Sequence, residues 1–399
     1  DGAADITLAT VNFTANTVEF AGGGGVTFKE GGTNFSNSLL VGTDGTGTLS
    51  SADGNTGVGI GVFGALTTGD NNVAVGLNAL DLNTTGHSNV AVGSNALITN
   101  TTSRDNVGVG FCSLNANTTG SRNTASGSLA LDSNTTACDN TATGYKALYA
   151  NTTGTENVAV GKSSLESNTT GNSNTSVGCG SLDANTTSSN NVAIGYESLG
   201  ANITGADNTA VGTNSLVKNT TGTDNSAFGK CSLACNTTAA ANTAFGYNSL
   251  CANTTGGSNT AIGHSALKSN TTVGGNTAIG DDAIRTNTTG SSLVGIGQNA
   301  MYANTTGCQN VAIGHSSLES NTTGCSHVAI GHLALSSNTT GTFNTAIGKQ
   351  AGDVTTTGSN NIMIGKGSDA DASGTNNVIA IGENVVSINN AVTFGNGGT

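Results

Sequence analysis

Apolar, small and polar residues recur along this chain with one fixed period. Gly59, Gly76 and Gly93 begin a column of twenty glycines that continues at the same 17-residue spacing to Gly382 without interruption. Residues 259–276 (NTAIGHSALKSNTTVGGN) show the typical repeat. A short constant period is the signature of a solenoid, in which each repeat forms one coil and successive coils stack. Residues 55–382 are therefore predicted to form a single repeat domain of about 20 coils.

Two apolar columns predict two short strands in each coil. Counted from the column glycine, position −1 is nearly always Val, Ile or Phe, as in Val75 and Ile194, and position +4 is mostly Leu, as in Leu80. Since strand side chains alternate between faces, we expect both columns to point inward. The predicted fold is an all-β, parallel β-solenoid with two strands per coil, stacked about 4.8 Å apart.

Small residues fill two further columns, at positions −2 and +3, as in Ala74 and Ala96. Both positions neighbour an apolar residue that is expected to face inward, so both are expected to face outward. Small outward residues favour the close approach of another chain, which predicts an interchain seam. The alternative is a sharp bend that leaves no room for bulk.

Asparagine occupies the predicted turn of 16 consecutive coils, each time in the pattern N-x-T. Asn favours such turns because it tolerates positive φ and bonds its own backbone. Stacked Asn side chains can form a hydrogen-bonded ladder, and N-x-T is also the acceptor pattern for N-glycosylation. Both interpretations apply to the same column: Asn83, Asn100, Asn117, Asn134, Asn151, Asn168, Asn185, Asn202, Asn219, Asn236, Asn253, Asn270, Asn287, Asn304, Asn321 and Asn338.

Composition and charge narrow the classes of function. The chain has 60 Gly and no Pro, and its net charge is −13 with only 11 scattered Lys and Arg residues. Proline would remove a ladder donor from every coil, which accounts for its absence. Nucleic-acid binding needs clustered basic residues, and membrane insertion needs about 18 consecutive apolar residues, so neither is expected. Disorder is the compositional alternative, but disordered tracts do not keep apolar residues in register.

The repeat resembles a known family of surface fibres. The motifs NVAVG at 72–76, NVAIG at 191–195 and NTAIG at 344–348 resemble the head repeats of trimeric autotransporter adhesins. The longer form of the repeat, with NTTG, is similar to repeats of viral and phage tail-fibre-like proteins. The resemblance covers about residues 55–396. It implies a left-handed β-roll, a homotrimer and a location on a virion or outside the cell.

The two ends do not follow the repeat. Residues 1–54 alternate apolar and polar positions at 6–13, 17–20 and 26–28, and we expect a β-rich cap or docking segment there. Residues 383–399 are expected to form a C-terminal cap. The run at 350–365 is similar to the end of fibres that precede a self-cleaving chaperone domain, which implies a cleavage point near Thr399.

Eight cysteines follow no Cys-x-x-Cys pattern, so a zinc site is not predicted from them. Cys308 and Cys325 are separated by one full period and should stack on adjacent coils, inside the separation that a disulfide requires. Cys235 and Cys251, one position short of a full period apart, are a second candidate pair. The alternative for both pairs is that they remain small buried thiols.

Position +1 carries aromatic and histidine side chains and is the candidate contact surface. An exposed column of this kind suits a sugar or a protein receptor, and the alternative is a variable solvent face. Its members are Phe111, Tyr145, Tyr196, Tyr247, His264, His315 and His332. No further ligands are apparent around these histidines within one chain, so no metal site is predicted. We also expect no cofactor and no enzymatic activity, because no catalytic triad, carboxylate pair or phosphate loop stands out.

These observations predict a structural fibre protein that forms a stiff rod and presents contacts for attachment to a host or another surface. Its expected partners are copies of itself, most simply in a homotrimer, and a host receptor or glycan. The alternative is a self-assembling extracellular filament, joined end to end through residues 1–54. An ice-binding solenoid is a minor alternative, because regular Thr ranks can order water, but the paired Thr residues point in opposite directions.

Overall fold

The computed structural model describes residues 27–32, 35–42 and 50–395 of the chain. Within these ranges the chain forms strands and turns, and it contains no helix of the length and hydrophobicity that crossing a membrane requires. The chain divides into two compact units, residues 1–191 and residues 192–399. The segments expected to alternate at 6–13 and 17–20 lie outside the described residues.

The first unit begins with an antiparallel pair and continues as a parallel stack. β1 (Thr27–Gly32) pairs antiparallel with β2 (Phe35–Gly42), and β2 pairs in parallel with β3 (Thr56–Val58). Each later strand pairs with the strand one period further along the chain, as Val73 pairs with Val90. These strands are β4 (Val73–Val75), β5 (Val90–Val92), β6 (Val107–Val109), β7 (Thr124–Ser126), β8 (Thr141–Thr143), β9 (Val158–Val160) and β10 (Thr175–Val177). Parallel stacking thus starts at β2, inside the segment expected to be a cap.

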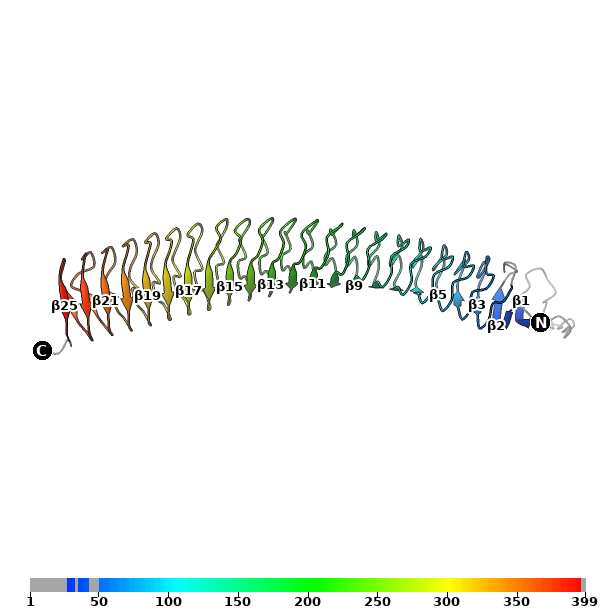
Figure 1. The fold of residues 1–399 in the computed structure, drawn as a ribbon, viewed down its shortest axis with the longest axis horizontal. Helices are drawn as coiled ribbons and strands as arrows, with labels where there is room; N and C mark the ends of the chain where they lie inside the picture. The colour runs from blue at the N-terminus through cyan, green and yellow to red at the C-terminus, as the bar shows by residue number, and fades with distance from the viewer. Residues whose placement is uncertain (1–26, 33–34, 43–49, 396–399) are drawn as a thin grey trace, which may run out of the picture. The chain divides into compact units, whose positions relative to one another are not determined.

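The second unit repeats the same register, and its coils follow one another in sequence order (Figure 1). Its main strands are β11 (Val192–Ile194), β12 (Thr209–Val211), β13 (Ser226–Phe228), β14 (Thr243–Phe245), β15 (Thr260–Ile262), β16 (Thr277–Ile279), β17 (Val294–Ile296), β18 (Val311–Ile313), β19 (Val328–Ile330), β20 (Thr345–Ile347), β21 (Ile362–Ile364), β23 (Ile379–Ile381) and β25 (Val392–Phe394). β22 (Asp369–Ala370) and β24 (Val386–Ser387) form a separate parallel pair. The last step, from Ile379 to Val392, is shorter than one full period. The predicted all-β, parallel solenoid of about 20 coils is confirmed.

Between β3 and β20 each coil contains one three-residue strand, so the prediction of two strands per coil is wrong there; among the described residues, only the coils that begin at Gly365 and Gly382 add a second strand, β22 and β24. The expected second strand around position +4 is a turn, in which Leu250 has a φ of 49°. That left-handed conformation is incompatible with an extended strand. The turn still bonds to the next coil, because the Leu250 N–H donates to the Ala266 carbonyl at 3.0 Å. Coil-to-coil bonding therefore does not require strand conformation here.

The interior of each coil is narrow, and this reverses two expectations. On β14 the small residue Ala244 is fully buried, whereas Phe245 at position −1 is 48% exposed. A Cβ added at Gly295, also at position −2, would lie 2.6 Å from Cγ1 of Ile284 at position +4. One large side chain from position +4 fills the space, so the Val/Ile/Phe column at position −1 points outward. The small columns face inward, so the expectation that they face outward is wrong and they do not support an interchain seam.

Two buried asparagine columns connect neighbouring coils. At position −4, the Asn242 backbone N–H donates to Oδ1 of Asn225 at 3.1 Å, and Asn242 Nδ2 donates to the Gly256 carbonyl at 3.0 Å. At position +7, Asn253 Nδ2 donates to the same Gly256 carbonyl at 2.9 Å and lies 3.2 Å from Oδ1 of Asn236. The two columns therefore meet at one carbonyl oxygen and satisfy polar groups in the interior that water does not reach.

The column glycine is required by both conformation and space. Gly263 has a φ of 137°, a region that only glycine adopts readily. A Cβ built on it would lie 2.3 Å from the carbonyl oxygen of Gly280 in the next coil. Any side chain at this position would separate adjacent coils, which explains why the column is invariant within this chain.

His327 occupies the −4 column, where most coils carry Asn, and its ring reproduces the Asn hydrogen bonds. Its Nε2–H donates to the Gly341 carbonyl at 2.7 Å, and its Nδ1 accepts the Asn344 N–H at 3.2 Å. This pattern requires the neutral imidazole with the proton on Nε2. Burial, which disfavours the charged ring, lowers the pKa of His327 to about 4.

Gly263→Ala is expected to lower the free energy of unfolding by about 3 kcal/mol or more, because a left-handed strain and a clash with Gly280 act together. Gly275→Ala is the matched control in the same coil: its φ is also positive, at 74°, but a Cβ there meets nothing within 4 Å. Guanidinium unfolding of the two variants measures the difference. Equal midpoints would show that close stacking does not constrain the column.

His327→Asn is expected to remove an acid-sensitive step. The folded pKa of about 4 lies below the ordinary value of 6.5, so the unfolded chain binds a proton more readily between these values. The contribution of the buried ring is complete above pH 6.5 and is lost as the pH falls towards 4, by about 3 kcal/mol in total. Thermal unfolding at pH 7 and pH 4.5 should show a smaller loss on acidification for the variant than for the wild type. His87→Asn alters an exposed histidine and should keep the wild-type loss.

Candidate functional site

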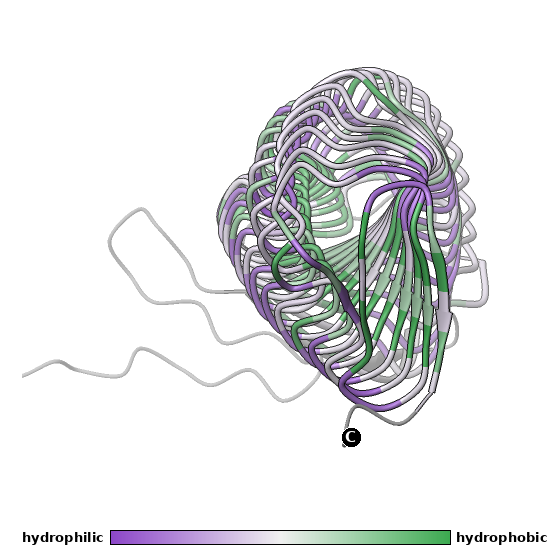
Figure 2. Ribbon diagram, turned by 90° about the vertical axis from the view of Figure 1, so that its left-hand side faces the viewer, coloured by the Kyte–Doolittle hydropathy of each residue, from purple (hydrophilic) through white to green (hydrophobic). Residues whose placement is uncertain are grey.

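The outward side of the strands forms the most extensive candidate surface, which we call the strand face. It consists of positions −3 and −1 of each coil, for example Thr260 and Ile262 on β15. From β3 to β23 the middle residue of each three-residue strand is buried and its two neighbours are not, as the alternation of strand side chains requires. Figure 2, seen from the C-terminal end, shows hydrophobic residues (green) on the strands of successive coils.

The strand face carries no charged residue in any coil from β3 to β23, where positions −3 and −1 are all Val, Ile, Phe, Thr or Ser. The chain's net charge of −13 therefore lies on other columns. On this face the Phe228 and Phe245 rings stack with centroids 4.4 Å apart. Large exposed apolar side chains such as Phe245 and Ile262 recur on this face among Thr and Ser, and such uncharged apolar surfaces are typical of interaction sites.

The +1 column, predicted as the contact surface, lies next to the strand face. The column glycine separates it from position −1 in every coil. Its aromatic members Phe111, Tyr145, Tyr196 and Tyr247 are exposed. Members on adjacent coils stack: the Tyr247 and His264 rings lie 5.6 Å apart, and the His315 and His332 rings lie 5.3 Å apart. The column thus presents flat ring faces and edges of a type suited to sugars or apolar side chains.

Ion pairs lie outside the strand face and connect neighbouring coils. Arg122 bonds the carboxylate of Asp139 through Nε and Nη2 at 2.6 and 2.8 Å, and the hydrogen bonds from the guanidinium lower the pKa of Asp139. Lys366 Nζ lies 2.9 Å from Oε1 of Glu383. All four side chains are largely exposed, so these pairs add little stability.

The asparagines of the N-x-T column are buried and hydrogen-bonded along the solenoid. For example, Asn100 Nδ2 donates to Asn83 Oδ1 at 3.1 Å, and the chain of bonds continues through Asn117 Nδ2 to Asn100 Oδ1 at 3.0 Å. Nδ2 is the atom to which a glycan would be attached. A glycan on the folded chain would have to occupy the interior, so the geometry supports the ladder interpretation of this column.

All eight cysteines are free thiols in the structure. The stacking predicted for Cys308 and Cys325 is present: their Sγ atoms lie 2.8 Å apart, and the hydrogen bond to Cys325 raises the pKa of Cys308. Cys235 and Cys251 adjoin through the backbone, since the Cys235 N–H donates to the Cys251 carbonyl at 3.0 Å. A disulfide at 308–325 stays a prediction.

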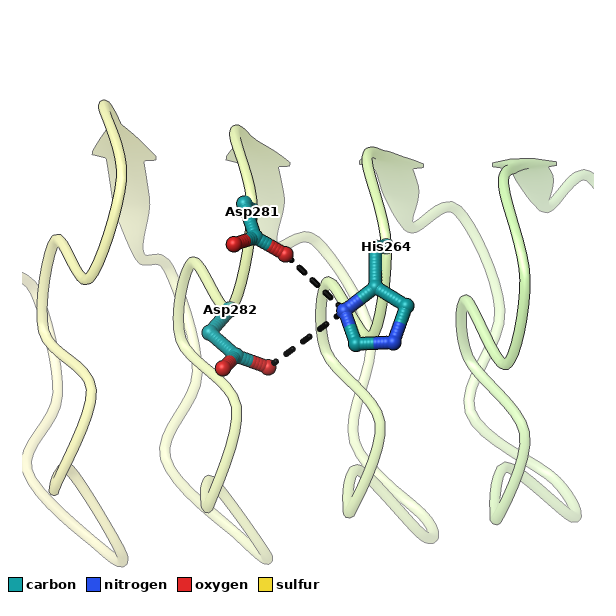
Figure 3. A group of neighbouring side chains, drawn as sticks. All are labelled: His264, Asp281 and Asp282. Carbon is teal, nitrogen blue, oxygen red and sulfur yellow. Dashed lines mark hydrogen bonds and ion pairs between the residues drawn. The ribbon is translucent and has the colours of Figure 1, made fainter.

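His264 lies beside two carboxylates that the sequence interpretation did not connect with it. Its Nδ1 is 2.9 Å from Oδ1 of Asp281 and 4.0 Å from Oδ1 of Asp282 (Figure 3). Asp281 stands at position +1 of the next coil, one period after His264. The 17-residue period could have predicted that Asp281 lies next to His264. It could not have predicted the approach of Asp282, because the direction of that side chain depends on the turn.

A carboxyl pair was also missed, near the C-terminal end of the solenoid. Asp369 occupies the +4 column where other coils carry Leu, and it is buried beside Asp353. Its carboxylate oxygens accept the Val354 N–H at 3.0 Å and the Ala370 N–H at 2.8 Å. Burial, together with the hydrogen bond to Asp353, raises the pKa of Asp369 to about 7. Asp369 lies inside the coil, and Asp353 is half-buried.

Comparisons with known proteins add no further assignment. No protein-family model matches the sequence, and no curated protein matches it.

Oxidation is expected to join Cys308 and Cys325. With oxidised glutathione as the oxidant, the two thiols lose two hydrogens, which reduce the glutathione disulfide. Closing the loop of one period between them should raise the free energy of unfolding by about 3 kcal/mol. Peptide mapping under non-reducing conditions measures the cross-link. Complete alkylation of all eight thiols after such treatment would contradict this prediction. The extent of cross-linking between Cys235 and Cys251 in the same sample provides the internal comparison.

Proposed function

We propose that this chain is a structural fibre protein whose solenoid associates with copies of itself through the strand face. The observation that carries the proposal is the absence of charge from the strand face in every coil from β3 to β23, together with its exposed Val, Ile and Phe side chains. These apolar side chains gain free energy when another surface removes them from water. The role is mechanical and needs no catalytic group.

A second copy of the chain is the partner that fits this face best. Its side chains repeat at the spacing of the coils, and only a surface with the same axial spacing meets every coil in an equivalent way. A second copy of the chain has that spacing because it contains the same repeat. The resemblance to adhesin heads and tail fibres favours three copies, left-handed winding, and a location outside the cell or on a virion. In such an assembly the strand faces would be covered.

The +1 column then provides the outer contacts. Its rings are exposed in the single chain, and along the column they are interspersed with aliphatic, charged and small polar residues. A varied column on a regular scaffold suits attachment to a host receptor or glycan. The filament alternative uses the same solenoid, with end-to-end joining through residues 1–54.

Mass measurement in native solution tests the association. The wild type is expected at three times the chain mass of 38.8 kDa. Ile262→Asp combined with Ile313→Asp places two carboxylates on the strand face and should release folded monomers, because each charge would have to be buried without a partner. Ile203→Asp is the matched control: Ile203 is 45% exposed, close to the 40% of Ile262, but lies in a turn away from the strands.

A monomeric wild type would exclude the self-association. An assembly that withstands the double substitution would exclude the strand face as its interface. Electron microscopy after dilution separates the two forms of assembly, since a fibre protein gives short separate particles and a filament gives continuous threads.

A further inference from the structure

We propose that His264, Asp281 and Asp282 form a binding site for a divalent transition-metal ion. The three residues come from two neighbouring coils, and one ligand atom of each lies within 4.8 Å of the other two. The site does not depend on self-association through the strand face, because its residues belong to positions +1 and +2. Figure 3 shows both carboxylates directed at the same ring nitrogen.

The separations suit an ion placed between the ligands. Metal–nitrogen and metal–oxygen bonds of about 2.1 Å in tetrahedral geometry place two ligand atoms about 3.4 Å apart. The observed distances from His264 Nδ1 are 2.9 Å to Asp281 and 4.0 Å to Asp282, on either side of that value. Small rotations of the carboxylates are therefore enough to complete the three-ligand geometry, and water would occupy the remaining position.

An unpartnered atom gives independent support. Oδ1 of Asp282 is buried from solvent and has no hydrogen-bond partner. The other oxygen of this carboxylate, Oδ2, is 3.4 Å from Nη1 of Arg285, which fixes the group with Oδ1 towards His264. A buried carboxylate oxygen without a partner is costly, and a bound cation would remove that cost. The arrangement thus holds one ligand in place before the ion binds.

The imidazole is also held in a suitable position. The Tyr247 ring stacks on His264 at a centroid distance of 5.6 Å with an interplanar angle of 14°. In the free chain Nδ1–H donates to Asp281. Binding replaces this proton with the ion, and neutral imidazole then carries its proton on Nε2, which faces away from both carboxylates in Figure 3. One imidazole and two carboxylates favour Zn²⁺ or Cu²⁺ over Mg²⁺ and Ca²⁺, which prefer oxygen ligands only.

Calorimetric titration of the full chain with Zn²⁺ tests the site. A Cys308→Ser, Cys325→Ser background keeps the thiol pair from competing for the ion. We expect one ion per chain in this background. Asp282→Asn and His264→Asn should each weaken binding by about tenfold or more, since each removes a ligand. Unfolding midpoints without metal establish that the variants fold.

His315→Asn is the matched control. His315 also stands at position +1 and stacks on a neighbouring ring. Among the described residues, however, it is not part of a group of three or more possible metal ligands. This variant should bind Zn²⁺ like the parent. In ¹⁵N-edited spectra, the ion should shift Nδ1 of His264 and leave the protonated nitrogen as Nε2.

Three results would overturn the proposal. They are no saturable Zn²⁺ binding by the parent, unchanged affinity in the His264→Asn variant, and loss of binding in the His315→Asn variant. The last would place the ion on the stacked histidines. Zn²⁺ should also raise the thermal unfolding midpoint of the parent and have a smaller effect on Asp282→Asn, because an ion that joins two coils stabilises only the folded state.

Discussion

The hydrogen bonds of the two asparagine columns are the interaction on which the rest of the structure depends. Each coil from β3 to β20 has one short strand and space for one large apolar side chain, so burial of apolar surface alone does not define its shape. The Asn242 and Asn253 amides meet at the Gly256 carbonyl and connect the two sides of the coil. Because each side chain also reaches the preceding coil, the same groups close one coil and position the next.

This constraint explains where the surface chemistry lies. With a polar ladder and one Leu inside, the strand can place only a small residue inward, and its two outer residues must face away. The apolar strand face is thus a consequence of the narrow interior. His327 shows that a different ring can serve this column, because it reproduces both Asn hydrogen bonds, whereas Leu293 and Val378 interrupt the column with buried apolar side chains.

Much of the fold could be predicted from the period, but the side-chain directions could not. The column from Gly59 to Gly382 defines the coils and their parallel register, and the structure agrees. The second strand was wrong because Leu250 and its equivalents adopt a left-handed conformation that nothing in their residue type indicates. The outward direction of Ile262 was missed because alternation alone does not say which of two adjacent residues is inside. The stack of Cys308 on Cys325 followed from spacing, whereas the approach of Asp282 to His264 needed the turn geometry.

The asparagine columns also have a direction. In most coils the backbone N–H at position −4 donates to the Oδ1 of the coil before it, as Asn259 does to Asn242 at 3.0 Å. A finished coil therefore offers the acceptors that the following segment needs. The ribosome delivers segments in that same order, so each new turn of chain can dock on a template made moments earlier. The direction of these amide hydrogen bonds therefore favours folding that proceeds from the amino end towards the carboxyl end.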